Sequence, residues 1–220
     1  MITTEQKYAF DNQGVLVVDN FLDEETAQSL SSLFYNTDDF EWIDQRREAH
    51  YKTAIKNDSP ELPDEDEIYT AQFHKSDSLA TTSELQQFML KIKGAANVLT
   101  EADIKYYTQP LCYRMLAGDH LRVHRDLYAG EFGFTYYLSK RWKWDWGGIA
   151  HYYLSNDDEM KPILPKYNRA VFRNESKEVE HYVSHVTDFA LEARNSINGW
   201  GSTSDLSTQN NGRVVGNYEL

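Results

Sequence analysis

The sequence predicts an α+β chain, mainly β, folded as a double-stranded β-helix (a two-sheet jelly roll) with supporting N-terminal helices. From Ile104 onward, short runs rich in β-branched and aromatic residues alternate with glycine-containing turns, which is typical of a two-sheet β fold. Before residue 100, two segments carry apolar side chains at helical spacing, so we expect helices that cover one sheet.

The N-terminal region begins with a predicted strand and helix. Residues 14–18 form a short apolar run rich in valine, which favours a strand. Asp23 can cap a helix over about 24–34. One face of that helix would carry the apolar residues Ala27, Leu30, Leu33 and Phe34.

A second helix is predicted to begin at Ser83. Ser83 and Gln86 have the spacing of a capping box, in which each side chain bonds the other residue's backbone. The stripe that follows, at helical spacing, predicts core packing rather than a ligand site. It consists of Leu85, Phe88, Met89, Ile92, Ala96 and Leu99.

Eight strands are expected after the helices. They lie at about 103–109, 111–117, 121–126, 132–139, 148–154, 168–173, 181–187 and 193–199. A chain of 220 residues fits one domain. We expect residues 1–220 to form that domain, with N-terminal elements over 8–100, a jelly-roll core over 103–200 and a polar tail over 201–220.

Composition limits the possible partners and compartment. The net charge of −13 argues against nucleic acid, because phosphate binding needs a basic face. With Cys112 as the only cysteine, no intramolecular disulfide can form, which favours a reducing compartment. Neither a signal peptide nor a membrane-spanning run is evident. We therefore expect a cytoplasmic protein with no membrane partner, in which Cys112 is a small buried residue rather than a nucleophile.

Two segments have open interpretations. Residues 56–67 carry six acids and one lysine. They form either a solvated loop or a lid that favours a cationic substrate. Trp142, Trp144 and Trp146 would share one face if extended, either in packing or as an aromatic wall at a substrate entrance. Gly147 and Gly148 predict a turn with positive φ.

The most informative motif is His124-Arg125-Asp126. In a strand, side chains two residues apart point to one face, so His124 and Asp126 would project together. A second histidine from a distant strand would complete two histidines and one carboxylate, a ligand set for iron with open positions. By itself the motif also fits a surface histidine and aspartate on a half-buried strand.

Four histidines are candidates to complete this set, and an arginine follows the two stronger ones. His181 and His185 would lie on one face of a strand, and His120 and His151 are weaker candidates. Arg194 offers a planar fork that matches a carboxylate.

Several motifs in register carry a family resemblance. The segments 14–23, 113–126, 132–139, 142–148, 181–187 and 194–200 resemble, in order, those of prolyl-hydroxylase-like, Fe(II)- and 2-oxoglutarate-dependent dioxygenases. The resemblance spans roughly residues 8–201. It includes a His-x-Val-x-x-Val strand from His181 and an Arg-x-Ser-Ile-x-Gly-Trp strand from Arg194.

The resemblance implies residue roles. His124, Asp126 and His181 would bind the metal, while His185 stands where relatives often carry proline. The residues implied for the co-substrate are Arg194, Tyr137, Ser196 and Tyr113. Tyr113 would serve if the turn that follows it holds one extra residue.

The resemblance also implies cofactors and an activity. The cofactors would be Fe(II), 2-oxoglutarate and O2, with ascorbate as an optional addition. The activity would be hydroxylation of an unactivated C–H bond, coupled to release of succinate. Halogenating relatives have a small residue where this chain has Asp126, so hydroxylation is expected rather than halogenation.

The substrate stays open at this point. It could be a prolyl or other residue of a protein or peptide, or a free amino acid or small metabolite. A non-catalytic jelly-roll binding protein is a further alternative, although all candidate ligands are present. A serine hydrolase is disfavoured because the sequence has no Gly-x-Ser-x-Gly motif.

Overall fold

A computed structural model describes residues 2–35, 42–47, 71–76, 82–108, 110–126, 130–154, 158–206 and 217–219. The acidic segment 56–67 lies outside these ranges. The described helices are α1 (Thr4–Gln13), α2 (Glu24–Tyr35) and α4 (Ser83–Thr100). None of them is long and apolar enough to cross a membrane.

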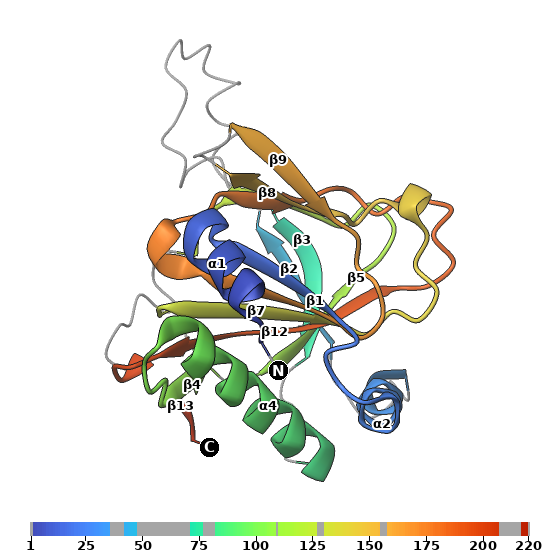
Figure 1. Ribbon diagram of the computed structural model, residues 1–220. Coiled ribbons are helices and arrows are strands. Elements are labelled where there is room, and N and C mark those ends of the chain that lie inside the picture. Colours follow the sequence, from blue (N-terminus) through green and yellow to red (C-terminus); the bar gives the residue numbers. More distant parts are fainter. Residues whose placement is uncertain are drawn as a thin grey trace.

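The strands form a single antiparallel sheet that curls on itself (Figure 1). The order along the sheet is β1-β10-β7-β12-β5-β3-β6-β11-β8-β9, with β2 paired to β3, β4 to β12, and β13 to β4. The bounds are β1 Val15–Asp19, β2 Trp42–Arg47, β3 Ala71–Ser76, β4 Tyr106–Thr108, β5 Leu111–Met115, β6 His120–His124, β7 Phe132–Tyr137, β8 Ala150–Leu154, β9 Glu159–Ile163, β10 Arg169–Asn174, β11 His181–Val183, β12 Arg194–Ser202 and β13 Asn217–Glu219. The predicted jelly-roll class is confirmed.

Each of the eight predicted strands has a counterpart in the structure. The structure also contains elements that the sequence did not predict. Of these, α1 buries only Phe10, so its sequence shows no apolar stripe. Strand β9 is largely exposed and contains Pro162, which suits an edge strand but gives no alternating pattern. The unpredicted strands β2 and β3 pair with each other, and β3 also joins β5 to β6.

Of the two predicted helix caps, that of α2 is confirmed and that of α4 is not. The Asp23 carboxylate accepts a hydrogen bond from the backbone N–H of Thr26 at 2.9 Å, so the predicted cap of α2 is confirmed. The predicted cap of α4 is wrong by one residue, because Thr82 rather than Ser83 is the N-cap. The Thr82 hydroxyl accepts from the backbone N–H of Leu85 at 3.2 Å, while Ser83 is already helical.

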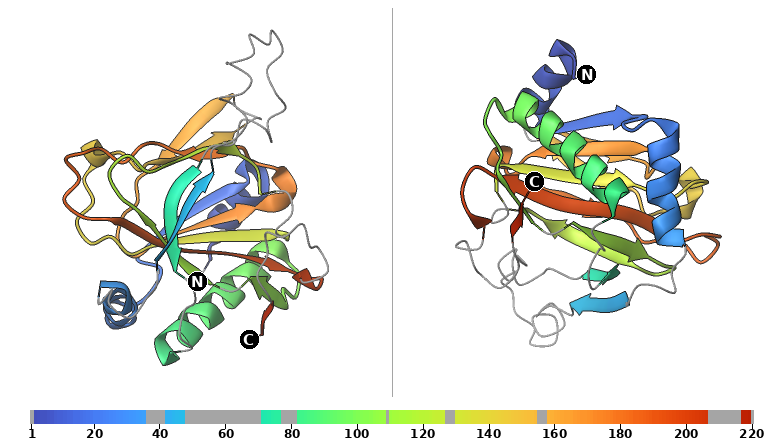
Figure 2. Two further views of the ribbon diagram at one scale, coloured as in Figure 1. Left: turned by 180° about the vertical axis from the view of Figure 1, so that it is seen from behind. Right: turned by 90° about the horizontal axis from the view of Figure 1, so that it is seen from below.

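Two apolar cores lie on opposite faces of the sheet. Figure 2 shows α4 lying across one face. There the predicted stripe of α4 is buried with Phe134, Tyr136 and Cys112 of the sheet. The inner side of the curl has its own core, which includes Tyr137 and Val171. The alternation of each strand therefore sends one set of side chains toward the helices and the other into the curl.

The three tryptophans do not share a face. The chain makes a 3-10 turn over Trp144–Trp146. Trp142 and Trp146 are buried and meet edge to face at 5.4 Å, whereas Trp144 is 78% exposed. The packing role holds for two of them, and the chain is not extended here, so the condition for a shared face is not met. Gly147 and Gly148 have the predicted positive φ, at 68° and 60°.

Candidate metal centre

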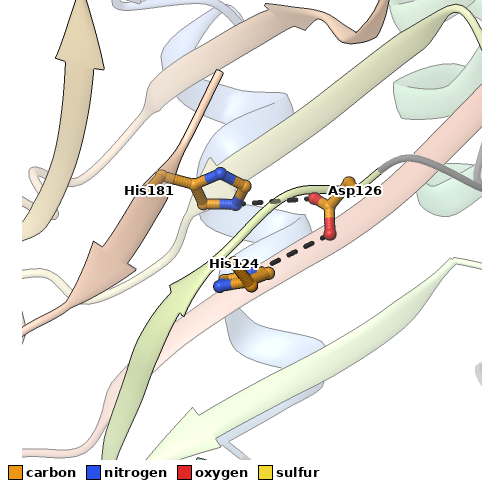
Figure 3. A group of neighbouring side chains, drawn as sticks. All are labelled: His124, Asp126 and His181. Atoms are coloured by element: carbon orange, nitrogen blue, oxygen red, sulfur yellow. Dashed lines mark ion pairs between the residues drawn. The ribbon is translucent and has the colours of Figure 1, made fainter. Parts of the chain in front are cut away.

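His124, Asp126 and His181 converge inside the curl (Figure 3). One possible ligand atom from each residue lies within 4.8 Å of the other two. His124 ends β6 and is paired in register with His181, which begins β11. Two neighbouring strands thus bring together histidines that are far apart in the sequence.

Asp126 does not belong to the strand that sequence analysis predicted over 121–126, since β6 ends at His124. The partner strand begins at His181, and the chain before it turns through Glu175–Lys177 and Glu178, whose φ is 51°. The ladder between β6 and β11 ends at the pair His124 and His181 and does not include residues 125 and 126. The Asp126 side chain nevertheless reaches both histidines, with its oxygens 3.7 Å from His124 Nε2 and 3.5 Å from His181 Nε2.

Both histidines are held in the tautomer that a metal requires. The Nδ1 of His124 lies 2.8 Å from the carbonyl of Arg122, and the Nδ1 of His181 lies 3.0 Å from the carbonyl of Val179. A carbonyl can only accept, so each Nδ1 carries the proton and each Nε2 keeps a lone pair. Tyr152 also stacks on the His181 ring, with centroids 5.2 Å apart.

The protonation states suit metal binding. Burial lowers the pKa of His124 to about 4, so His124 is neutral near pH 7. Burial alone would raise the pKa of Asp126, but its contact with His181 and the positive charge of Arg173 hold that pKa well below its usual range. Two imidazole nitrogens and one carboxylate are the donor set of an Fe(II) site with open positions.

The rival histidines lie elsewhere. His185 stacks on His120 with ring centroids 4.2 Å apart. Within the described ranges, neither residue joins the cluster of possible metal ligands. A bulge in the pairing of β6 with β11 separates this histidine pair from the pair formed by His124 and His181.

Arg194 is buried, being only 4% exposed, and its partners are neutral. It donates to the carbonyl of Gly148 at 2.7 Å and to the Tyr137 hydroxyl at 3.3 Å. A third N–H lies 3.4 Å from the Met115 sulfur. In the described part of the chain, Arg194 forms no ion pair with a carboxylate. A buried guanidinium with neutral partners suits an anionic ligand.

Ser196 completes this group. In the sheet it lies directly between Tyr137 of β7 and Tyr113 of β5, so the three side chains share one face. The turn that follows the strand of Tyr113 is closed by a hydrogen bond from the backbone N–H of Asp119 to the carbonyl of Leu116, at 2.9 Å. The Ser196 hydroxyl is buried and has no hydrogen-bond partner among the described residues. The predicted co-substrate residues are therefore neighbours, and an unsatisfied hydroxyl beside Arg194 fits a carboxylate ligand.

Sequence reasoning missed two residues that touch the metal cluster. Arg173 and Trp200 both donate to Asp126, at 3.1 and 3.2 Å. Trp200 lies an even number of residues after Arg194 on one strand, so its place on the inner face could have been predicted. Arg173 directly follows the apolar run Ala170–Phe172. A charged residue in a buried strand is rare without a partner, and this is the signal that could have pointed to Arg173.

The comparisons with known proteins agree with this geometry. Residues 110–202 match the family model described as the 2OG-Fe(II) oxygenase superfamily. This range contains all the residues of the candidate site. No curated protein sequence matches the chain.

Solved structures share the fold at low sequence identity. A prolyl-4-hydroxylase from Pseudomonas putida is 17% identical with a TM-score of 0.62, over 91% of this chain and 98% of that one. A prolyl hydroxylase from Trichoplax adhaerens, in complex with a hypoxia inducible factor peptide fragment, is 14% identical with a TM-score of 0.60, over 90% and 87%. HygX from Streptomyces hygroscopicus, with nickel, 2-oxoglutarate and hygromycin B bound, is 13% identical with a TM-score of 0.62, over 92% and 88%.

The match to the family model covers the segment that carries the two histidines, the aspartate and the buried arginine, and the fold agrees with it. Residues 110–202, which carry the whole candidate site, therefore match the 2OG-Fe(II) oxygenase superfamily, a family named for its use of Fe(II) and 2-oxoglutarate.

Proposed function

We propose that this enzyme hydroxylates an unactivated C–H bond, with His124, Asp126 and His181 as the iron ligands. The observation that carries the proposal is the convergence of their ligand atoms within 4.8 Å, with both Nδ1 atoms bonded to backbone carbonyls. Three protein ligands leave positions open for co-substrate and O2. When bound, Fe(II) supplies the centre at which O2 is activated while 2-oxoglutarate is converted to succinate.

The co-substrate is held, in this proposal, by residues on the inner faces of β12, β7 and β5. Arg194 binds the distal carboxylate of 2-oxoglutarate, because it is a buried cation without a carboxylate partner in the described ranges. The unpartnered Ser196 hydroxyl donates to the same group. Tyr137 already bonds Arg194, and Tyr113 lies across from Ser196, so both line this end. Burial strengthens each of these contacts by excluding water.

The outcome of the reaction follows from Asp126. Its carboxylate occupies a ligand position that would have to be vacant for a halide to bind. The geometry therefore favours hydroxylation of the substrate. We also propose that the protein acts in the cytoplasm, on the composition of the chain alone.

For the substrate, we favour a prolyl or other amino-acid residue within a protein or peptide. The support is structural similarity to a prolyl-4-hydroxylase and to a prolyl hydroxylase with a bound peptide. The second candidate is a free amino acid or small metabolite. It is supported by equal similarity to HygX, which binds hygromycin B.

Succinate release distinguishes these candidates. The purified enzyme with Fe(II), 2-oxoglutarate and ascorbate is offered proline-containing peptides, free amino acids and aminoglycosides, and the product mass is measured. A peptide that gains one oxygen atom supports the first candidate, whereas a small molecule that does so supports the second. Asp126→Ala is the negative control and should release no succinate. An absence of succinate from the parent with every substrate offered, despite bound metal, would contradict the proposed activity.

A further inference from the structure

Asp126 is positioned by side chains rather than by the sheet. It lies two residues beyond the last ladder pair of β6, His124 with His181. Its backbone is thus outside the hydrogen-bonded ladder that fixes the two histidines. Its carboxylate is 14% exposed and is reached by donors from β10 and β12.

The two carboxylate oxygens have different surroundings. Oδ2 accepts from Arg173 Nη2 at 3.1 Å and from Trp200 Nε1 at 3.2 Å. Oδ1 lies 3.7 Å from His124 Nε2, and Oδ2 lies 3.5 Å from His181 Nε2. Two strong donors on Oδ2 compete with a metal for its lone pairs, so Oδ1 is the oxygen left for the metal.

Arg173 is itself fixed on three sides. It is 3% exposed, and it donates through Nε to Glu175 at 3.0 Å and through Nη1 to Thr135 at 3.1 Å. With Nη2 on Asp126, each nitrogen of the guanidinium has a protein acceptor. Arg173 is therefore not arranged like Arg194, which has neutral partners and suits an incoming anion.

Gly133 makes room for this arrangement. In the sheet, Gly133 of β7 lies between Arg173 of β10 and Trp200 of β12. A Cβ atom at Gly133 would lie 1.9 Å from Glu175 Oε1 and 2.6 Å from Arg173 Nη2. Any side chain at position 133 would displace Arg173 and Glu175. The requirement is one of space, since Gly133 does not have positive φ.

We propose that Arg173, held by Glu175 in the space above Gly133, is a positioning residue that fixes Asp126 for binding the metal through Oδ1 alone. This inference rests on the proposed function, because it assumes that Asp126 is a metal ligand. Residues that orient a ligand from behind typically change metal affinity 10–100-fold when replaced. The same change is expected here without loss of the fold.

The test uses the metal-free full-length chain and titrates it with Mn(II) by calorimetry and with Co(II) by visible absorption. Arg173→Met alone would leave Glu175 buried without its partner, so it is combined with Glu175→Gln. We expect this double variant to bind Mn(II) about 10–100-fold more weakly than the parent. Its Co(II) spectrum at saturation should differ, because the carboxylate is free to rotate.

One further variant and two controls separate positioning from charge and from packing. Gly133→Ala removes no charge but should displace Arg173 and weaken Mn(II) binding in the same direction. Its matched control is Gly94→Ala, because a Cβ at Gly94 in α4 meets no atom within 4 Å. For Arg173 the matched control is Arg169→Met, on the same face of β10, where Arg169 pairs with Asp19. Both controls should bind Mn(II) like the parent.

The outcomes are distinguishable. If the parent bound neither ion, the proposed function would fail and this inference with it. If the parent bound Mn(II) and the double variant and Gly133→Ala, folded by circular dichroism, bound it equally well with unchanged Co(II) spectra, only this inference would fail. The affinity for 2-oxoglutarate at saturating metal should stay within a few-fold of the parent, since Arg194 is untouched.

Discussion

At the scale of single residues, the metal site depends on three side chains that cannot replace one another. In the proposed function, His124 and His181 each supply one nitrogen, and Asp126 supplies the oxygen. We expect His124→Ala, Asp126→Ala and His181→Ala each to abolish succinate formation. Each should also weaken Mn(II) binding in titration calorimetry, because one of three ligands is lost.

The matched control is His185→Ala. His185 stacks on His120 and stays outside the cluster, so turnover and metal binding should be retained. If His185→Ala lost its metal while His181→Ala kept it, the ligand assignment would be wrong.

The buried arginine predicts a separate loss, in co-substrate affinity. Arg194→Ala should weaken 2-oxoglutarate binding by roughly 2–5 kcal/mol, because the carboxylate would lose a buried charged partner. Arg194→Lys should recover part of this, since an ammonium keeps the charge but not the planar fork. The measurement is the dissociation constant for 2-oxoglutarate at saturating Mn(II).

Arg169→Ala is the control for this prediction. Arg169 is paired with Asp19 and is not in contact with Arg194. Unchanged 2-oxoglutarate affinity in Arg194→Ala would show that the clamp lies elsewhere.

At the scale of elements, the start of α4 gives a prediction that separates neighbouring residues. Thr82 caps the helix, and Ser83 is its first helical residue. Thr82→Ala should lower the free energy of unfolding by about 1 kcal/mol, because the backbone N–H of Leu85 loses its acceptor. Urea denaturation followed by circular dichroism measures this change.

Ser83→Ala should have a much smaller effect, since its hydroxyl bonds only the exposed Glu84 side chain. A larger loss in Ser83→Ala than in Thr82→Ala would support the capping box that the sequence suggested and would contradict the observed cap.

At the scale of the whole molecule, metal binding should stabilise the fold. The histidine ligands come from β6 and β11, which are far apart in the sequence, so a bound metal cross-links the curl of the sheet. A ligand that binds only the folded state at 100 times its dissociation constant adds about 2.7 kcal/mol. For a chain of this size, that corresponds to a rise in Tm of roughly 5–10 °C.

Thermal melting of the metal-free chain with and without Mn(II) tests this expectation. Addition of a chelator should reverse the rise. Asp126→Ala should show little or no rise at the same Mn(II) concentration. An equal rise in the parent and in Asp126→Ala would place the stabilising metal at another site.

The sequence determined the class of fold and most of the candidate site. The stripe of α4 and the alternation of the strands predicted which faces are buried, because periodicity follows from backbone geometry alone. The order of the motifs predicted the cluster of His124, Asp126 and His181 and the group around Arg194. Local spacing could not separate His181 from His185, and the choice came from the resemblance.

Only the tertiary structure decided how Asp126 is held. The end of β6 depends on where β11 begins, and this is a property of strand pairing rather than of either segment. Arg173 and Trp200 reach Asp126 because β10, β7 and β12 are adjacent in the sheet, with Gly133 leaving room between them. Such contacts join distant parts of the chain, so their identity depends on register and space, which the sequence of any one segment does not contain.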